Sequence, residues 1–175
     1  HLKIEAYHWV LAFGTDDTVM ADAFRELRVN LQSLEVSPGP RVILVSSPSA
    51  SEGRTTTAIN LALALGEAGR SVVIVDGDLR RPAVAATLGL DTGPGLTAVL
   101  SEATELGDAL RATRAQQVSA LPAGDPPGNP TELLGNASAR TTFERLGERF
   151  DYVVIDSPPL TVKDAGLLAA YAEGV

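Results

Sequence analysis

Small and hydroxyl-bearing residues fill the stretch from Ser46 to Thr57, between an apolar run and a helical pattern. In such a position, backbone N–H groups and a helix N-terminus can bind phosphate oxygens. Gly53 would let the backbone approach the ligand, and the Thr55 hydroxyl would bind Mg²⁺. The strict phosphate-loop pattern G-x-x-x-x-G-K-[S/T] fails twice, because Pro48 stands at the first glycine and Arg54 at the lysine. Alone, the stretch also fits an ordinary small-residue turn.

Carboxylates end two further apolar runs. One run ends in Asp76-Gly77-Asp78-Leu79-Arg80, and the other, Tyr152 to Asp156, has the form of a Walker B strand. Two carboxylates two residues apart can face the same side, where they could hold the water ligands of Mg²⁺ or accept a proton, with Arg80 as a positive partner. Each motif alone also fits an acidic turn. All three in this order, each at a strand end, are hard to obtain by chance.

Apolar periodicity predicts the elements that position these motifs. The pattern indicates buried strands and helices in alternation, with a loop rich in Pro and Gly over 122–130: strands 41–46, 71–76, 117–121 and 152–156; a helix from Ala21 ended by Ser37 to Pro40; helices 55–69 and 137–149; short helices 82–88, 95–100 and 106–113. Alternation implies an α/β fold with a doubly wound, mostly parallel sheet and helices on both faces. Ligands bind beyond the carboxyl ends of such strands, so the three motifs should share one edge.

Composition excludes several classes of function. The 175 residues suffice for one domain, and their net charge of -8 argues against nucleic acid as a partner. Cysteine is absent and the only histidines are His1 and His8, which excludes disulfides and thiolate sites and nearly excludes histidine-based zinc sites. No apolar run is long enough to span a bilayer and no secretory signal is visible, so we expect a cytoplasmic location.

Together the motifs resemble the deviant-Walker ATPase superfamily, and within it the bacterial tyrosine kinases of capsule and exopolysaccharide synthesis. The D-x-D-x-R form of Asp76, Asp78 and Arg80 is the discriminating element, supported by the stretches 121–124, 129–134 and 150–159. The resemblance covers about residues 21–174. The predicted first helix is similar to the family's E-x-x-R-x-x-R segment, which mediates ring-like oligomerisation; its counterparts here are Asp22, Arg25 and Arg28.

The resemblance implies an ATP- and Mg²⁺-dependent protein-tyrosine kinase. The residues expected to hold the phosphates of ATP or ADP are Ser49, Ala50, Ser51, Glu52, Gly53, Arg54, Thr55 and Thr56. Thr55, Asp78 and Asp156 would organise Mg²⁺, and Asp76 is the candidate general base, although the roles of Asp76 and Asp78 could be exchanged. Arg80 would hold the acidic pair or an adjacent subunit. Asp164 lies in a stretch that resembles the family's segment after the Walker B strand, and we assign it a lesser role in the site.

Three departures from the family matter. Arg54 is a planar fork where the family has a compact lysine, so we expect nucleotide binding rather than efficient catalysis, with Arg54 still counted among the catalytic groups. The tyrosines Tyr7, Tyr152 and Tyr171 are scattered, and packing suits them better than phosphorylation. Finally, the sequence stops where a further strand is expected. We therefore expect an extension over 1–20 and a kinase domain over 21–175 that lacks its last strands.

The resemblance also implies partners: a second copy in a ring that phosphorylates in trans, a tyrosine-rich C-terminal tail, a transmembrane polysaccharide co-polymerase adaptor (fused or separate), and a tyrosine phosphatase. The adaptor would place the domain at the inner face of the cell membrane. Two alternatives stay open. One is a non-catalytic nucleotide-binding scaffold. The other is a positioning ATPase of the partition or cell-division type, although those proteins carry an additional lysine where Ser49 stands here.

Overall fold

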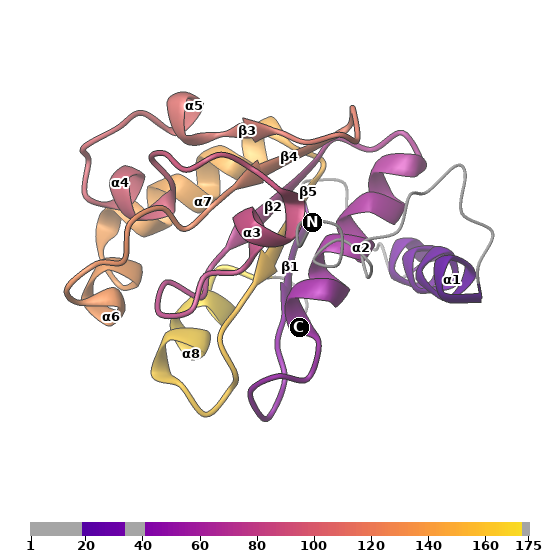
Figure 1. Cartoon of the computed structure of the whole chain (residues 1–175), viewed down its shortest axis with the longest axis horizontal. Helices are drawn as coiled ribbons and strands as arrows, with labels where there is room; N and C mark the ends of the chain where they lie inside the picture. Colours follow the sequence, from indigo (N-terminus) through magenta and orange to yellow (C-terminus); the bar gives the residue numbers. More distant parts are fainter. Residues whose placement is uncertain (1–18, 34–40, 173–175) are drawn as a thin grey trace, which may run out of the picture.

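A five-stranded sheet organises the protein, in a computed structural model that describes residues 19–33 and 41–172 (Figure 1). Its order is β1-β5-β2-β4-β3, with bounds β1 Arg41–Val45, β2 Val72–Asp76, β3 Arg111–Ala112, β4 Val118–Leu121 and β5 Tyr152–Asp156. β1, β5, β2 and β4 run parallel, and only β3 pairs in the antiparallel sense, against β4. The prediction of a doubly wound, mostly parallel sheet is confirmed.

Helices cover both faces of the sheet. They are α1 Val19–Ser33, α2 Arg54–Glu67, α3 Val84–Leu88, α4 Leu96–Leu100, α5 Leu106–Ala109, α6 Pro130–Leu134, α7 Ala137–Arg149 and α8 Lys163–Ala169. In Figure 1, α1 lies beside α2, on the far side of the molecule from α4 and α6. Among the described residues, none of these helices is long and apolar enough to cross a membrane.

Side-chain alternation along the central strands divides the core into two clusters. On β2, Val72 and Ile74 belong to the cluster around α2, whereas Val73 and Val75 belong to the cluster that includes Phe143 of α7. All five residues of β2 and of β5 are buried. Strands buried on both faces need continuous apolar runs, which is why these segments were recognisable in the sequence.

Local signals fix the ends of several helices. The Asn136 side chain accepts a hydrogen bond of 2.8 Å from Ala139 N and caps α7, an arrangement that satisfies an otherwise unpaired helix donor. Asn129 caps α6 in the same way, with Pro130 in the first helical turn. Before α2, Gly53 has φ +82°, a backbone conformation that residues with a Cβ rarely adopt.

The predicted strands and long helices are observed within one to two residues, but the middle of the chain differs. The helix expected over 106–113 is wrong: α5 ends at Ala109, and Arg111–Ala112 form β3. The cause is tertiary, since Arg111 pairs with Ala120 and Ala112 with Ser119 of β4. The helices α6 and α8 were not predicted. The predicted stop of the first helix at 37–40 lies outside the described residues.

Candidate functional site

The carboxyl ends of β1, β5 and β2 lie side by side. The register pairs Val45 with Asp156 and Asp156 with Asp76. The loop that follows β1 therefore begins next to both strand-end aspartates, which places the three sequence motifs at one edge of the sheet as predicted. In Figure 1 the loops that follow β1 and β5 lie together at the bottom of the view.

The loop between β1 and α2 is hydrogen-bonded to itself. The Ser47 hydroxyl donates to Ser49 O at 2.7 Å, and Ser49 N donates to the Glu52 carboxylate at 3.1 Å. Ser51 has a positive φ of 62°, as has Gly53. Pro48 to Gly53 are exposed. A carboxylate of the chain therefore accepts a hydrogen bond from a loop N–H of the kind that binds phosphate oxygens.

Arg54 points into this site, and its side chain is only 13% exposed. Its Nε donates to Ser157 O at 2.9 Å, and one terminal nitrogen donates at 2.7 Å to both Ser47 Oγ and Ser49 O. The other terminal nitrogen lies 3.9 Å from a carboxylate oxygen of Asp78. The guanidinium thus joins the loops that follow β1, β2 and β5. A phosphate group that enters the site would have to compete with these acceptors for the N–H groups of Arg54.

Asp156 is buried at the end of β5 and contacts Thr55 in the first turn of α2. The Thr55 hydroxyl donates to Asp156 Oδ2 at 2.5 Å. Asp156 Oδ1 is buried and has no hydrogen-bond partner in the part of the chain that the structure describes. Burial raises the pKa of Asp156 to about 6, against the opposing effects of the Thr55 hydrogen bond and the Arg54 charge. The site therefore holds one carboxylate oxygen with unused capacity to accept a hydrogen bond or bind a cation.

Asp76 is fully buried at the end of β2. Its Oδ2 accepts two hydrogen bonds of 2.9 Å, from Ala83 N and Val84 N at the start of α3. Its Oδ1 is buried and, among residues 19–33 and 41–172, has no hydrogen-bond partner. The pKa of Asp76 is raised to about 7, chiefly by burial and also by the negative charge of Asp156, against the lowering effect of the two backbone donors. Such a pKa suits a group that exchanges a proton near neutral pH.

Asp78 and Arg80 lie in the turn that follows Asp76. Asp78 is buried, and its Oδ1 accepts from Arg81 N at 3.1 Å. Arg80 Nε donates to Asp164 Oδ2 of α8 at 2.8 Å, away from the Asp76 carboxylate. Arg80 thus makes its side-chain hydrogen bonds with Asp164 and Thr131 and interacts with Asp78 through its charge; both roles expected for it stay predictions.

These residues fit a magnesium ion held with a nucleotide. Within residues 19–33 and 41–172, two buried carboxylate oxygens lack partners, and the Thr55 hydroxyl in the first turn of α2 contacts Asp156. Mg²⁺ prefers oxygen ligands and usually takes only one or two carboxylates from a protein, with phosphates and waters completing its shell. Among the described residues, no group of three or more His, Cys, Asp or Glu is arranged to hold a metal.

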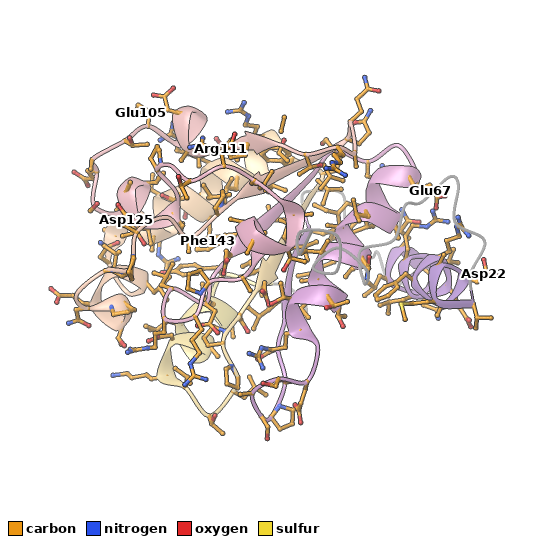
Figure 2. All side chains as sticks on the ribbon, in the orientation of Figure 1. Asp22, Glu67, Glu105, Arg111, Asp125 and Phe143 are labelled. Carbon is orange, nitrogen blue, oxygen red and sulfur yellow. The ribbon has the colours of Figure 1, made fainter. Side chains whose placement is uncertain are left out.

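Of the residues assigned to oligomerisation, Arg80 lies in the turn after β2, whereas Asp22, Arg25 and Arg28 lie at the other end of α2. Arg25 contacts Glu67 through two hydrogen bonds of 3.0 and 3.1 Å and Asp22 at 3.0 Å. Arg28 donates to Ala64 O at 3.3 Å and lies 3.9 Å from Glu67. Figure 2 shows Asp22 and Glu67 on this side of the molecule. Both arginines therefore hold α1 against α2 of the same chain; their role between chains stays a prediction.

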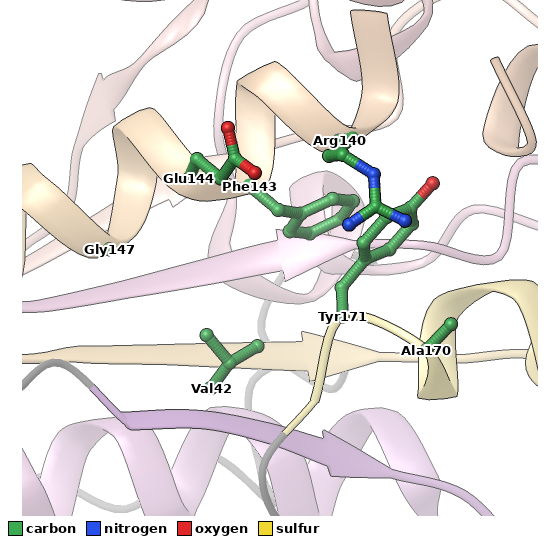
Figure 3. A pocket seen from close by; sticks show the side chains of 7 residues that line it. All are labelled: Val42, Arg140, Phe143, Glu144, Gly147, Ala170 and Tyr171. Atoms are coloured by element: carbon green, nitrogen blue, oxygen red, sulfur yellow. The ribbon is translucent and has the colours of Figure 1, made fainter. Parts of the chain in front are cut away.

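A separate pocket of about 250 Å³ lies between α7, β1 and the end of α8 (Figure 3). It contains none of the predicted site residues. Its wall includes Tyr171, whose ring stacks on Phe143 at 4.7 Å and whose hydroxyl donates to Leu134 O at 2.9 Å. Tyr152 is buried in β5. The prediction that these two tyrosines are packing residues is confirmed, and Tyr7 lies outside the described residues.

Comparison with known proteins identifies the family. A family model described as an AAA domain matches residues 40–170. The tyrosine-protein kinase YwqD of Bacillus subtilis is 31% identical over 166 residues, covering 94% of this chain and 70% of that protein. The chain belongs to the bacterial tyrosine-kinase family. The tyrosine-protein kinase ptk of Acinetobacter johnsonii is also 31% identical over 166 residues, yet this tyrosine-kinase domain spans only 23% of that much longer protein.

Solved structures agree with this assignment. The chimerical protein CapA2B2 superposes on the tyrosine-kinase chain with a TM-score of 0.87 at 28% identity, over 94% of this chain and 73% of that one. The septum site-determining protein MinD from Pyrococcus horikoshii, complexed with Mg-ADP, gives a TM-score of 0.68 at 30% identity, over 77% of this chain and 55% of that one. The P-loop fold is therefore shared with both groups.

Sequence reasoning gave Asp164 only a lesser role and missed the contacts that hold two of the site's arginines. Ser157 follows Asp156 directly, so its position at the strand end could have been read from the sequence, but not that its carbonyl would receive Arg54. Thr131 and Asp164, which contact Arg80, lie 51 and 84 residues from it in the chain. They come together only through the placement of α6 and α8, for which the sequence carries no direct signal.

Proposed function

We propose that the chain is an ATP- and Mg²⁺-dependent protein-tyrosine kinase domain that regulates exopolysaccharide or capsule synthesis. One observation carries the proposal: a phosphate-type loop lies beside two buried aspartates that each have one oxygen, Asp76 Oδ1 and Asp156 Oδ1, with no partner within the described structure. Buried polar groups are normally satisfied. Two that are not, next to a loop of this type, indicate that a ligand completes the site.

The loop from Ser49 to Thr56 would hold the phosphates through its N–H groups and the start of α2. Thr55 and Asp156, already in contact, would hold Mg²⁺, with Asp78 contributing directly or through water. ATP would supply the transferable phosphoryl group, and Mg²⁺ the positive charge that offsets its phosphate oxygens. MinD, which shares this fold and is solved with Mg-ADP, supports nucleotide binding by the chain.

Asp76 is the candidate general base for an incoming tyrosine hydroxyl. It lies at a strand end on the active edge, its Oδ2 is fixed by two backbone donors, and its Oδ1 is free to accept. Its pKa of about 7 places the carboxyl near the pH at which it would act. Fixed orientation and matched proton affinity are the two properties that a general base requires.

Arg54 is expected to favour binding over catalysis. A lysine presents a compact charge to the phosphates, whereas the Arg54 guanidinium is committed to Ser47, Ser49 and Ser157. Charge placed away from the transferring phosphoryl group stabilises the transition state less. We therefore expect slow phosphotransfer with nucleotide still bound.

Assembly follows the same proposal. The domain would form rings with copies of itself, phosphorylate a tyrosine-rich tail in trans, meet a tyrosine phosphatase, and lie in the cytoplasm at the inner face of the membrane through a co-polymerase adaptor. A non-catalytic scaffold would share all of this except phosphotransfer. The second candidate function, a positioning ATPase, is favoured by the likeness to MinD and disfavoured by Ser49 at the position of the additional lysine and by the net charge of -8.

The test is phosphotransfer by the purified chain and by Arg54→Lys, with ATP, Mg²⁺ and a tyrosine-rich peptide. We expect weak phosphotyrosine from the chain and a stronger signal from Arg54→Lys, because a lysine can direct its compact charge at the phosphates, whereas the donors of Arg54 are committed to Ser47, Ser49 and Ser157. Arg70→Lys is the matched control, since Arg70 is exposed. Nucleotide binding without phosphotyrosine from either protein would favour the scaffold. ATP hydrolysis stimulated by DNA rather than by the peptide would favour the positioning ATPase.

A further inference from the structure

Three side chains from separate segments meet beside the candidate site: Arg80 in the turn after β2, Thr131 of α6 and Asp164 of α8. Arg80 donates to Asp164 Oδ2 at 2.8 Å through Nε and to Thr131 Oγ1 at 3.0 Å through a terminal nitrogen. The Thr131 hydroxyl donates in turn to Asp164 Oδ1 at 2.5 Å. Both oxygens of Asp164 are thereby occupied, and each pair of the three residues is in direct contact.

Asp164 is a charged group inside the protein. Its side chain is 2% exposed, against 48% for Arg80. Burial would raise the pKa of Asp164, but the hydrogen bonds from Arg80 and Thr131 and the charge of Arg80 outweigh burial and hold the pKa below its usual range. A buried carboxylate is costly unless it is paired and hydrogen-bonded. Asp164 therefore makes a fixed anchor, and Arg80 is the flexible side chain that it holds.

The anchor acts on the turn that carries Asp78. Arg81 N donates to Asp78 O and to Asp78 Oδ1, each at 3.1 Å, which closes a four-residue turn with Leu79 and Arg80 at its centre. Leu79 is 1% exposed and fixed in the core. Arg80 is fixed by Asp164 and Thr131. Both central residues are thus held from outside the turn, and the Asp78 carboxylate is left 3.9 Å from Arg54.

We propose that Asp164 and Thr131 are positioning residues for the nucleotide site. By holding Arg80, they fix the turn that presents Asp78 to Mg²⁺ and to Arg54. The inference rests on the proposed function, in which Asp78 helps to organise Mg²⁺. It extends that function to two helices, α6 and α8, that pack on each other and that contribute no residue to the phosphate loop. Arg80, held by residues of these two helices, then helps to position Asp78 in the site of its own chain.

The test is the gain in ADP affinity that Mg²⁺ provides, measured by titration calorimetry with and without the metal. Thr131→Val removes both hydroxyl contacts at nearly constant volume. We expect it to reduce the gain from Mg²⁺ roughly three- to tenfold, the usual value of one or two lost hydrogen bonds, with the affinity for ADP alone unchanged within about twofold. Asp164→Asn should reduce the gain further, and Thr131→Ser should restore it. Thr141→Val is the matched control, because the Thr141 hydroxyl bonds only within α7.

Hydrogen exchange in the ligand-free protein gives a second readout. Faster exchange of the Arg81 amide in Thr131→Val, but not in Thr141→Val, would support the positioning role independently of any ligand; unchanged exchange would overturn it. If Mg²⁺ strengthens ADP binding equally in the wild type and in Thr131→Val, the positioning role is wrong and the proposed function stands. If Mg²⁺ adds nothing in the wild type, the proposed function is wrong and the positioning role falls with it.

Discussion

The charged groups beside the two ends of α2 differ in burial and in hydrogen bonding. At its N-terminal end, Asp76 and Asp156 are buried, each with one oxygen that lacks a partner in the described structure, and burial raises both pKa values. At its C-terminal end, Arg25 and Glu67 lie at the surface and form two direct hydrogen bonds. With 14 residues at about 1.5 Å each, α2 separates the two ends by roughly 20 Å.

This contrast separates a site from a structural contact. Arg25, Glu67 and Asp22 satisfy one another at the surface, so their contribution is to hold α1, although Nε of the neighbouring Arg28 is buried without a partner among the described residues. The strand-end carboxylates remain unsatisfied and costly in the empty protein, a condition that persists in proteins where a function requires it. Removing charge should therefore have opposite consequences at the two ends: greater stability and lost binding at the strand ends, slightly lower stability and intact binding at α1.

The largest effect is expected from Asp156→Asn. It removes the negative charge that Thr55 and Arg54 face, and with it the strongest candidate ligand of Mg²⁺. We expect the affinity for Mg-ADP to fall roughly 10- to 100-fold, the range for losing a charged hydrogen-bonding group, as measured by calorimetry. Asp125→Asn is the control, because Asp125 is exposed in the loop that follows β4 (Figure 2). Equal loss of affinity in both variants would contradict a specific metal role.

The second-largest effect is expected on the free energy of unfolding as a function of pH, measured without nucleotide or metal. The pKa of Asp76 rises from 3.8 to about 7 on folding, so between these values the folded state binds more protons than the unfolded state. The free energy of unfolding should therefore fall as pH increases from about 4 to 7. Asp76→Asn removes this cost and should raise stability at pH 8 by roughly 2 kcal/mol, because the amide still accepts from Ala83 and Val84.

Denaturant unfolding of both proteins at pH 5 and pH 8 checks that prediction. The two stabilities should differ less at pH 5 than at pH 8, and they should meet only below about pH 4, where Asp76 is protonated in both the folded and the unfolded state. A constant difference at both values of pH would mean that the variant changes contacts rather than charge. Saturating Mg-ADP should remove the advantage of Asp76→Asn, since a bound cation would stabilise the carboxylate form.

Much of this site could be predicted from the sequence, for an identifiable physical reason. β2 and β5 are buried on both faces, so their apolar runs and terminal aspartates marked the strand ends, and parallel pairing then brings strand ends together. What could not be predicted depends on tertiary placement. β3 exists because Arg111 finds a partner in β4, and Asp164 matters because α8 folds back beside the turn of Arg80.

The smallest effect is expected at the other end of α2. Arg25→Gln removes the bonds to Glu67 and Asp22, and because exposed ion pairs contribute little, we expect the Tm to fall by no more than about 3 °C. Glu67→Gln should do the same, and the double variant should lose less than the sum, because both changes break one shared contact. In 0.5 M salt the differences should shrink. Mg-ADP affinity should match the wild type throughout, since the pair lies roughly 20 Å from the phosphate loop; a loss of affinity as large as that of Asp156→Asn would show that the two ends of α2 do not act independently.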